Sequence, residues 1–266
     1  MKMRNSLAQK HQKFLRIQKN KKIFTLIIQI SVLCLFLAVW EAGSRVGLID
    51  AFLVSSPSRI FKTLIELNFS GALWSNVMVT VLETMVGFIF GTFLGILLAS
   101  ILWWSKTLEK IAEPYLVIFN ALPKVALGPI IIVWMGAGTL AIVVMSLLIS
   151  VIITTIHILS GFKNAEMEKI LLMKSLGANK FQIFKKIILP VSLPNVISVL
   201  KVNIGMSLIG VITGEFLVAK KGIGYLIVYG SQIFKLDLVM AGIFILAIIA
   251  SMIYFLISNV KPVNKF

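Results

Sequence analysis

The feature that most constrains this chain is a series of long apolar segments, each about as long as a helix that crosses a bilayer. A hydrocarbon core about 30 Å thick requires about 20 consecutive apolar residues in helical form. Because lipid cannot satisfy open backbone hydrogen bonds, such segments must be helical. The sequence therefore predicts an all-α, polytopic integral membrane protein with about six transmembrane helices. Their expected ranges are 23–40, 77–104, 115–134, 139–159, 195–214 and 236–257.

Composition supports the same class of protein. Of the 266 residues 59% are hydrophobic and the mean hydropathy is +1.00, whereas soluble domains average about 45–50% apolar residues. The net charge of +16 would indicate a nucleic-acid partner in a soluble protein, but here the charge lies in loops, so we expect membrane lipid and no nucleic acid. The single cysteine, Cys34, lies in the first apolar segment, which excludes an intrachain disulfide.

The positive charges predict the orientation of the chain in the membrane. Of the 26 Lys and Arg residues, eighteen lie in the basic stretch 1–22, near Lys106, in the stretch 163–186 or near the C-terminus. The loops expected on the other side hold six. Since cytoplasmic loops of membrane proteins are rich in Lys and Arg, we expect both termini in the cytoplasm. The expected organisation is a basic cytoplasmic tail, 1–22, followed by a transmembrane domain, 23–266.

A basic polar segment, residues 164–194, interrupts the apolar series and is too polar to cross the bilayer. It predicts two short helices joined by a hinge. The first spans about 165–175, and Gly177 then supplies the left-handed backbone that ends it. Asn179 is expected to cap the second helix, and Gln182 three residues later completes a capping box.

The second of these helices is expected to be amphipathic. Its apolar face would comprise Phe181, Phe184, Ile187 and Ile188. We expect Leu189-Pro190 to end it, because the residue before a proline is pushed out of the helical region. A basic amphipathic segment beside a membrane either lies on anionic lipid or contacts another protein, and the residue pattern alone leaves both open.

Polar residues inside the expected spans are candidates for function. Two prolines, Pro123 and Pro129, predict a kink in the third span, with Lys124 near its midpoint. Lys124 either lines a path that attracts an anion or reaches a surface or a structural carboxylate. Glu83 in the second span should face protein or water. Three glycines at intervals of four in that span favour close helix packing, although a surface of the path is the alternative: Gly87, Gly91 and Gly95.

The stretch from Lys174 to Ala178, with Leu189-Pro190 and Leu193-Pro194, resembles the cytoplasmic coupling loop of binding-protein-dependent ABC importer permeases. In that family the loop carries a Glu-Ala-Ala triplet, a glycine a few residues later and a Leu-Pro about a dozen residues further on. Gly177 and Leu189-Pro190 fit this spacing. The triplet positions hold Leu171, Leu172 and Met173, and the nearest acidic residues are Glu166 and Glu168. The glutamate that helps hold the loop in a groove on an ATPase subunit is therefore missing.

Two further stretches resemble the nitrate, aliphatic sulfonate and taurine branch of these permeases. One is the proline-rich run LPKVALGPIIIVWMGAG, and the other is Gly214-Glu215 followed by Gly222-Ile223-Gly224-Tyr225. In this branch the glutamate ends the fifth helix and Gly-Leu-Gly-Tyr follows. Glu215 is expected to shape an outer gate or to contact the binding protein. The alternative is a carboxylate at the helix end beside Lys220 and Lys221, a pairing that would contribute little if exposed.

The resemblance implies a permease subunit of an ABC importer in a bacterial inner membrane. It would form the path for a small anionic organic solute, similar to a sulfonate, taurine or nitrate. Implied partners are two cytoplasmic ATPase subunits, a second copy of this chain and an extracytoplasmic binding protein. The implied ATPase-coupling residues are Glu168, Leu171, Lys174, Ser175, Gly177, Ala178, Lys180, Phe181, Phe184, Leu189 and Pro190. The candidate path residues are Pro123, Lys124 and Glu215.

Several motifs of enzymes are missing from the sequence. There is no G-x-x-x-x-G-K-[ST] loop, no H-E-x-x-H helix and no G-x-S-x-G turn. We therefore expect no catalytic residues, no metal and no cofactor bound by this chain, with ATP and Mg²⁺ on the partner ATPase. His157 is expected to be an interfacial histidine rather than a metal ligand. Two other functions stay open: an ion-coupled secondary transporter, and a membrane anchor for an ATPase that transports nothing.

Overall fold

The structure is a computed structural model that describes residues 2–258, and every regular element in this range is helical. The chain forms two compact units, residues 1–63 and 64–266. Five helices are long and apolar enough to cross a membrane, and a bent pair brings the number to six if it counts as one span. The prediction of an all-α polytopic membrane protein is therefore confirmed.

The first unit begins with one long helix. Helix α1, Lys2–Val46, runs without a break from the basic stretch into the first apolar segment, and its portion Ile23–Val46 is the membrane-span candidate. The short α2, Ala51–Val54, follows, and α3, Pro57–Phe69, begins with Pro57. Glu41 ties α1 to the start of α3, because its carboxylate accepts hydrogen bonds from the Ser58 amide at 3.1 Å and the Ser58 hydroxyl at 2.9 Å.

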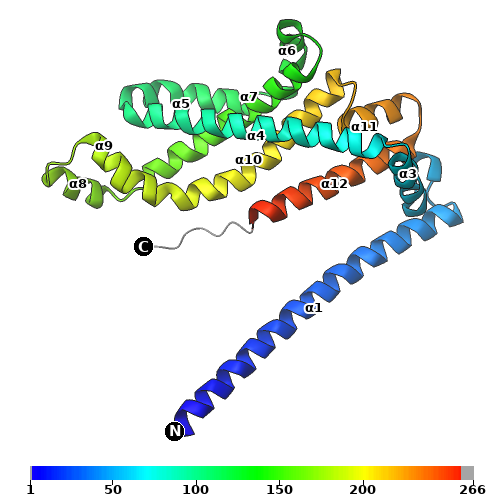
Figure 1. Cartoon of the computed structure of the whole chain (residues 1–266), viewed down its shortest axis with the longest axis horizontal. Coiled ribbons are helices and arrows are strands. Elements are labelled where there is room, and N and C mark those ends of the chain that lie inside the picture. Colours follow the sequence, from blue (N-terminus) through cyan, green and yellow to red (C-terminus); the bar gives the residue numbers. More distant parts are fainter. Residues whose placement is uncertain (1, 259–266) are drawn as a thin grey trace. The chain divides into compact units, whose positions relative to one another are not determined.

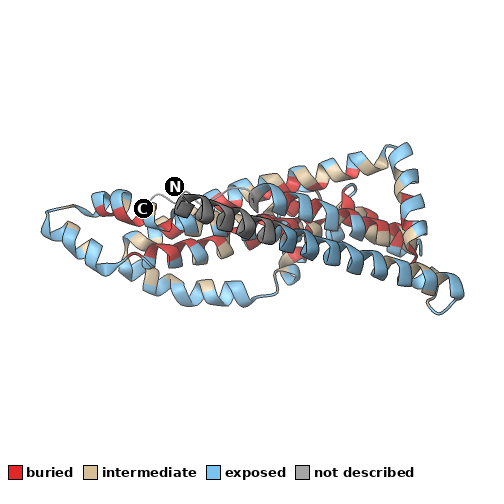
Figure 2. Cartoon of the chain, turned by 90° about the horizontal axis from the view of Figure 1, so that it is seen from below, coloured by how far each residue is buried: buried red, intermediate tan, exposed pale blue. Residues whose placement is uncertain are grey.

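The second unit is built on three long helices that lie side by side (Figure 1). They are α4, Ala72–Trp104, α7, Thr139–Lys163, and α10, Leu189–Val218. The short α11, Ile223–Gln232, packs against α10 and α12, Leu236–Ser258. Buried residues lie within this unit, and its outward faces are largely exposed, as expected for helices that face lipid (Figure 2).

Small residues allow α4 and α10 to approach α7 closely. Gly87 and Gly91 lie directly against Ser146 and Ser150, where a Cβ atom would overlap the serine side chains. On the other side, a Cβ atom at Gly210 would lie 2.6 Å from the Cα of Ser146. Transmembrane helices commonly associate through such small residues. Between the two alternatives for the α4 glycines, the structure favours packing.

Hydrogen bonds between side chains also join the three helices. Asn203 of α10 is at the centre: its amide nitrogen donates to Thr92 of α4 at 2.6 Å, and its oxygen accepts from Ser150 of α7 at 2.9 Å. One turn along, the Ser146 hydroxyl donates to the Ser207 carbonyl at 3.0 Å. These four side chains therefore have hydrogen-bond partners within the bundle, which is how polar groups persist inside a membrane protein.

The third apolar segment is broken, as its prolines predict. Helix α5, Lys106–Ala121, ends before Pro123, a single 3₁₀ turn η1, Lys124–Leu127, follows, and α6, Gly128–Met135, leaves at an angle of 91°. Leu122, the residue before Pro123, has the extended backbone that a following proline imposes. The change of direction therefore occurs at Pro123, whereas Pro129 lies in the first turn of α6.

The two-helix segment before α10 is present, but its end differs from the prediction. Helix α8, Met167–Ser175, and α9, Lys180–Ile183, are followed by a π-helical turn η2, Phe184–Ile188, which runs directly into α10. The expectation that Leu189-Pro190 ends the second helix is wrong. The helical path continues from Lys180 to Val218 through both Pro190 and Pro194.

The surroundings of Pro190 explain why this proline does not break the helix. Pro190 lies in the first turn of α10, where a missing backbone N–H is tolerated. The Ser192 hydroxyl donates to the carbonyl of Ile188, so a side chain satisfies an acceptor near the proline. Local π adjustments and serine hydroxyls are known ways to satisfy the backbone around proline in transmembrane helices.

Candidate functional site

The candidate site is the segment 164–188, which we call the knuckle: α8, the hinge around Gly177, α9 and η2. Gly177 has φ of +78°, the left-handed conformation that the sequence predicts. The Gly177 amide donates to the Lys174 carbonyl and the Ala178 amide to the Met173 carbonyl, both at 2.9 Å. This pair of bonds is the Schellman motif, which ends α8.

The capping box at the start of α9 is also confirmed. The Gln182 amide donates to Asn179 Oδ1 at 2.8 Å, and the Asn179 amide donates to Gln182 Oε1 at 2.9 Å. Two backbone donors that the helix start leaves open are thereby satisfied. The hinge between α8 and α9 consequently has a defined geometry on both sides.

An aromatic cluster fixes the knuckle to the ends of α4 and α7. The ring of Phe184 lies 4.9 Å from Trp103 and 6.0 Å from Trp104, both at the end of α4, and 5.5 Å from Phe162 of α7. Tilted and edge-on aromatic pairs at such distances are favourable beyond their buried area. Three neighbouring apolar side chains of the knuckle are buried in the same core: Ile183, Ile187 and Ile188.

Lys180 adds a charged contact to this anchor. Its ammonium group lies 5.5 Å from the ring centre of Trp103 and 5.7 Å from that of Trp104, and it donates to the Trp104 carbonyl. A cation over an indole face is favourable, and so is a cation at the carbonyl end of a helix. Lys180, predicted as a coupling residue, therefore joins α9 to the last turn of α4.

The structure corrects the predicted apolar face of the second helix. Phe184 lies in the anchor, whereas Phe181 is 59% exposed and does not share its face. The prediction assumed one α-helical period from Phe181 to Ile188. The π-helical turn inside this stretch has a longer period, so it rotates the later residues relative to Phe181.

The knuckle instead exposes a different set of large apolar side chains. Leu171 is 56% exposed, Leu172 61% and Leu176 73%. With Phe181 and the exposed Met167 they form what we call the exposed apolar set. An exposed group of large apolar side chains with charged neighbours is typical of a protein-contact surface. Two of its members, Leu171 and Leu172, occupy the first two positions of the Glu-Ala-Ala triplet that this sequence lacks.

The remaining predicted coupling residues lie at the borders of the knuckle. Glu168 and Ser175 are exposed on α8, and the Ser175 hydroxyl donates to the Leu172 carbonyl at 2.9 Å. Leu189 is exposed at the start of α10, and Pro190 beside it is half-buried. These residues flank the exposed apolar set without forming a catalytic arrangement.

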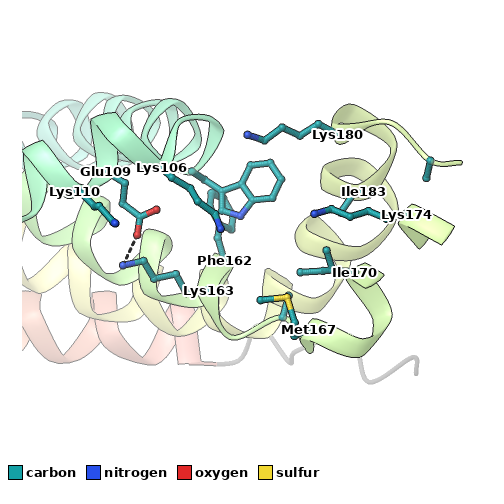
Figure 3. Close-up of a pocket in the computed structure, with 13 residues that line it drawn as sticks. Lys106, Glu109, Lys110, Phe162, Lys163, Met167, Ile170, Lys174, Lys180 and Ile183 are labelled. Atoms are coloured by element: carbon teal, nitrogen blue, oxygen red, sulfur yellow. Dashed lines mark ion pairs between the residues drawn. The ribbon is translucent and has the colours of Figure 1, made fainter. Parts of the chain in front are cut away.

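A cavity of about 520 Å³ lies between the knuckle and the start of α5 (Figure 3). Lys174, Ala178 and Lys180, all predicted coupling residues, line it from the knuckle. Lys106 and Lys110 line it from α5, and no pattern in the sequence singled them out. They lie more than 50 residues before the knuckle, so local spacing carries no signal that the two segments meet.

The opposite end of the bundle holds a buried carboxylate. Glu215 near the end of α10 is only 1% exposed, and it accepts hydrogen bonds from the Thr80 hydroxyl at 2.7 Å and the Gly224 amide at 2.6 Å. Thr80 also accepts from the Ile223 amide at 2.8 Å. Glu215 therefore binds the first turn of α11 to α4. The alternative of a helix-end carboxylate paired with Lys220 and Lys221 is wrong, because among the described residues Glu215 forms no ion pair with either lysine.

Glu83 lies beside this network, facing protein as predicted. It is 4% exposed and borders a second cavity of about 320 Å³, together with Thr139, Lys220 and Lys221. Among the residues that the structure describes, its Oε2 atom has no hydrogen-bond partner. Two glutamates thus lie close together at this end of the bundle.

Lys124, the other charged path candidate, lies at the break between α5 and α6. Its ammonium group donates to the Asn120 carbonyl at 2.8 Å, in the last turn of α5, and the neighbouring Pro123 is exposed. Neither cavity is lined by Pro123, Lys124 or Glu215. The structure therefore does not bring the three predicted path residues together in one pocket.

Comparison with known proteins agrees with this architecture. Residues 91–262 match the family described as the inner membrane component of binding-protein-dependent transport systems. The chain belongs to this family. The predicted family is thereby confirmed, and its members are transport components rather than enzymes.

The chain is also similar in sequence to individual permeases. It is 25% identical over 216 residues to the putative aliphatic sulfonates transport permease SsuC of Bacillus subtilis, covering 81% of this chain and 78% of that protein. It is 28% identical over 192 residues to the formylaminopyrimidine transport permease ThiX of Halalkalibacterium halodurans, covering 72% and 76%. The first of these supports the predicted resemblance to the sulfonate branch.

The fold also matches a solved structure. A chain of the inward-facing MetNI methionine ABC transporter, in its CY5 native crystal form, superimposes with a TM-score of 0.58. The match covers 72% of this chain and 93% of that chain, at 18% sequence identity. At this identity the likeness shows the fold alone.

Proposed function

We propose that this chain forms the translocation path of an ABC importer and that its knuckle is the surface on which a cytoplasmic ATPase docks. The observation that carries this proposal is the contrast between the two sides of the knuckle. One side is anchored by Phe184 among aromatic residues of α4 and α7, and the other exposes large apolar side chains.

The exposed apolar set suits a groove on a partner protein. Interface cores are depleted of charge and enriched in aromatic residues and methionine. Leu171 and Leu172 replace the acidic triplet of the family pattern, so apolar burial takes the role that the missing glutamate has there. Glu168 borders the set and supplies a polar contact at its rim.

The anchor allows movement of the ATPase to reach the membrane spans. Helical structure is continuous from Lys180 to Val218, so displacement of α9 is transmitted directly into α10. Packing of Phe184 against Trp103 and Phe162 transmits it to α4 and α7. Rigid-body movement of packed helices is a common mode of switching between two states. Because the sequence has no nucleotide-binding loop, ATP and Mg²⁺ are held by the partner.

The proposed solute is a small organic anion, delivered by an extracytoplasmic binding protein. Lys124 at the break in the third span offers a cation within the membrane domain. The relation to a permease named for aliphatic sulfonates also supports an anion, while the relation to one named for formylaminopyrimidine leaves the solute itself to the binding protein. The assembly would comprise two copies of this chain, two ATPases and one binding protein.

The proposed orientation places the knuckle and both termini in the cytoplasm of a bacterial cell, with the chain in the inner membrane. It rests on the excess of Lys and Arg in the tail and the knuckle. The same orientation places Glu215 near the outer surface, where a binding protein would deliver the solute.

A double substitution tests the docking surface. Changing Leu172→Asp and Phe181→Asp puts charge into the proposed contact, and we expect co-purification of the ATPase to fall by at least about tenfold, since buried hot-spot positions contribute about 2 kcal/mol or more. The matched control, Leu172→Met with Phe181→Leu, keeps the surface apolar and should retain the ATPase. Undiminished co-purification by the Asp variant would refute the docking surface.

Two further measurements separate the alternative functions. Solute uptake by this chain alone in liposomes with only an ion gradient would indicate a secondary transporter. Absence of solute-stimulated ATP hydrolysis in the assembled complex would indicate an anchor. The proposal predicts no uptake without the ATPase and stimulated hydrolysis with it.

A further inference from the structure

The cavity beside the knuckle gathers positive charge from four helices. Five lysines line it: Lys106 and Lys110 of α5, Lys163 of α7, Lys174 of α8 and Lys180 of α9. The only carboxylate in its lining, Glu109, forms an ion pair with Lys163 at 2.5 Å. Figure 3 shows Lys174 and Lys180 extending from the knuckle toward the α5 side of the cavity.

Three of these ammonium groups have no counterion among the residues that the structure describes. Among the described residues, Lys106, Lys110 and Lys174 form no ion pair or hydrogen bond with another side chain. Like charges gathered in one cavity repel one another, so the arrangement favours an anionic ligand. The start of α5 adds to this preference, because Lys106 is its first residue and the N-terminal end of a helix carries partial positive charge.

The rest of the cavity is apolar. Trp103, Phe162, Ile170 and Ile183 contribute to its lining, and Met167 lies at its edge. A small inorganic anion would make no favourable contact with these apolar side chains, and it would leave most of the 520 Å³ cavity unfilled. A ligand with a negatively charged group at one end and an apolar body at the other matches both halves of the lining.

The position of the cavity relative to the membrane narrows the class of ligand. Trp103 and Trp104 end the long apolar helix α4, and tryptophan is enriched at the level of lipid headgroups. Basic pockets between transmembrane helices on the cytoplasmic side are a recognised way of binding anionic headgroups. The ligand with these properties that is always present at this depth is an anionic phospholipid.

We propose that the cavity is a binding site for the phosphate headgroup of an anionic phospholipid. Lys106 and Lys110 of α5 and Lys174 of α8 hold the phosphodiester, and the glycerol and first acyl carbons lie against Trp103 and Phe162. The lipid thereby bridges α5 and α8, and it fastens the knuckle to the bundle at a second place besides the Phe184 anchor. The site needs no ATPase, so it is testable on this chain alone.

Lipid binding to the full-length chain in nonionic detergent tests the proposal. Native mass spectrometry with phosphatidylglycerol as the titrant gives the dissociation constant. Phosphatidylcholine, whose headgroup is zwitterionic and has no net charge, is the reference. The double variant Lys106→Gln with Lys110→Gln should bind phosphatidylglycerol roughly 30-fold more weakly, because each lysine contributes about 1 kcal/mol to attraction of an anionic lipid. Its binding of phosphatidylcholine should stay unchanged.

The matched control is Lys185→Gln with Lys186→Gln. It removes the same charge from the same end of the protein, at exposed lysines that do not line the cavity. This variant should bind phosphatidylglycerol nearly as well as the unaltered chain. An equal loss in both variants would overturn the proposal, because it would mean diffuse surface attraction rather than a site.

Two more measurements show whether the ligand is a lipid or a free phosphate compound, and whether the variants stay folded. Soluble glycerol 3-phosphate should not compete with phosphatidylglycerol at comparable concentration, and effective competition would show a free-phosphate site instead of a lipid site. Circular dichroism melting should be the same for both double variants, since all four lysines are at the surface. If melting is unchanged and phosphatidylglycerol binds the Lys106 and Lys110 variant normally, the proposal is wrong.

Discussion

Different interactions stabilise the two ends of the bundle formed by α4, α7 and α10: buried hydrogen bonds at one end and aromatic packing at the other. At one end, the buried carboxylate of Glu215 accepts from Thr80 of α4 and from the backbone of α11, so the contacts are short, directional and inside the protein. At the other end, the knuckle is attached by tilted and edge-on contacts between aromatic rings and leaves large apolar side chains exposed. The first arrangement fixes the start of α11 against α4, whereas the second holds a segment that keeps an exposed apolar surface, as the proposed docking of an ATPase requires.

The difference follows from the backbone amide donors that each end of the bundle must pair with acceptors. The start of α11 presents backbone amides inside the membrane domain, and an unsatisfied donor there costs about 1–3 kcal/mol. Glu215, Thr80 and Asn76 supply the acceptors. The knuckle satisfies its own amides through the Gly177 and Asn179 motifs, so apolar packing suffices to hold it.

The largest expected effect on stability is at the Glu215 end. Glu215→Leu removes the acceptor of the Thr80 hydroxyl and of the Gly224 amide, and we expect a loss of about 3–5 kcal/mol in the free energy of unfolding. Thermal unfolding of the purified chain measures it. Hydrogen exchange should rise first in α11.

The amide variant Glu215→Gln serves as the control for this prediction. It keeps one oxygen acceptor with nearly the same shape, so it should lose less than half as much stability as Glu215→Leu. Equal stability of Glu215→Leu and the unaltered chain would remove the distinction between a hydrogen-bonded end and an apolar one.

The next effect concerns the aromatic anchor. Phe184→Ala removes a half-buried ring from contact with Trp103 and Phe162, and we expect a loss of about 2–3 kcal/mol, below the range for fully buried phenylalanine. Hydrogen exchange should increase in α8 and α9 while α11 stays protected.

The neighbouring Phe181 provides a matched comparison on the same short segment. Because its ring is 59% exposed, Phe181→Ala should cost less than about 1 kcal/mol in stability yet weaken binding of the ATPase. If the two alanine variants lost stability equally, the assignment of Phe184 to the anchor and Phe181 to the contact surface would fail.

The existence and approximate extent of the apolar helices follow from the sequence, because a bilayer leaves few other structures for such segments. The local motifs followed as well. Gly177 and the pair Asn179 and Gln182 act within a few residues of themselves, so sequence spacing was enough to predict their geometry. The break at Pro123 is local in the same sense.

The contacts between distant segments did not follow from the sequence. Thr80 and Glu215 are 135 positions apart, and nothing local indicates that they meet. The π-helical turn at Phe184 was missed because an α-helical period fits the same apolar residues, and a turn of different period becomes favourable only when Phe184 packs among Trp103 and Phe162. Tertiary packing decided these features.

The smallest expected effect is at the capping box. Asn179→Ala removes one cap of α9, at a cost of about 1 kcal/mol. The change should appear as faster hydrogen exchange at the Gln182 amide, with little change in thermal unfolding of the bundle. The conservative variant Asn179→Asp should keep the protection, since aspartate caps helices equally well. An unchanged exchange rate in Asn179→Ala would show that packing alone positions the start of α9.

The most direct test of the central claim is chemical labelling of a single thiol on the knuckle. Cys34 is the only cysteine, so Cys34→Ser with Leu172→Cys leaves one thiol at an exposed position of α8. With a membrane-impermeant maleimide, we expect labelling in inside-out vesicles without ATPase, protection when the ATPase is bound, and no labelling of intact cells. Labelling from outside intact cells, or equal labelling with and without bound ATPase, would contradict the central claim.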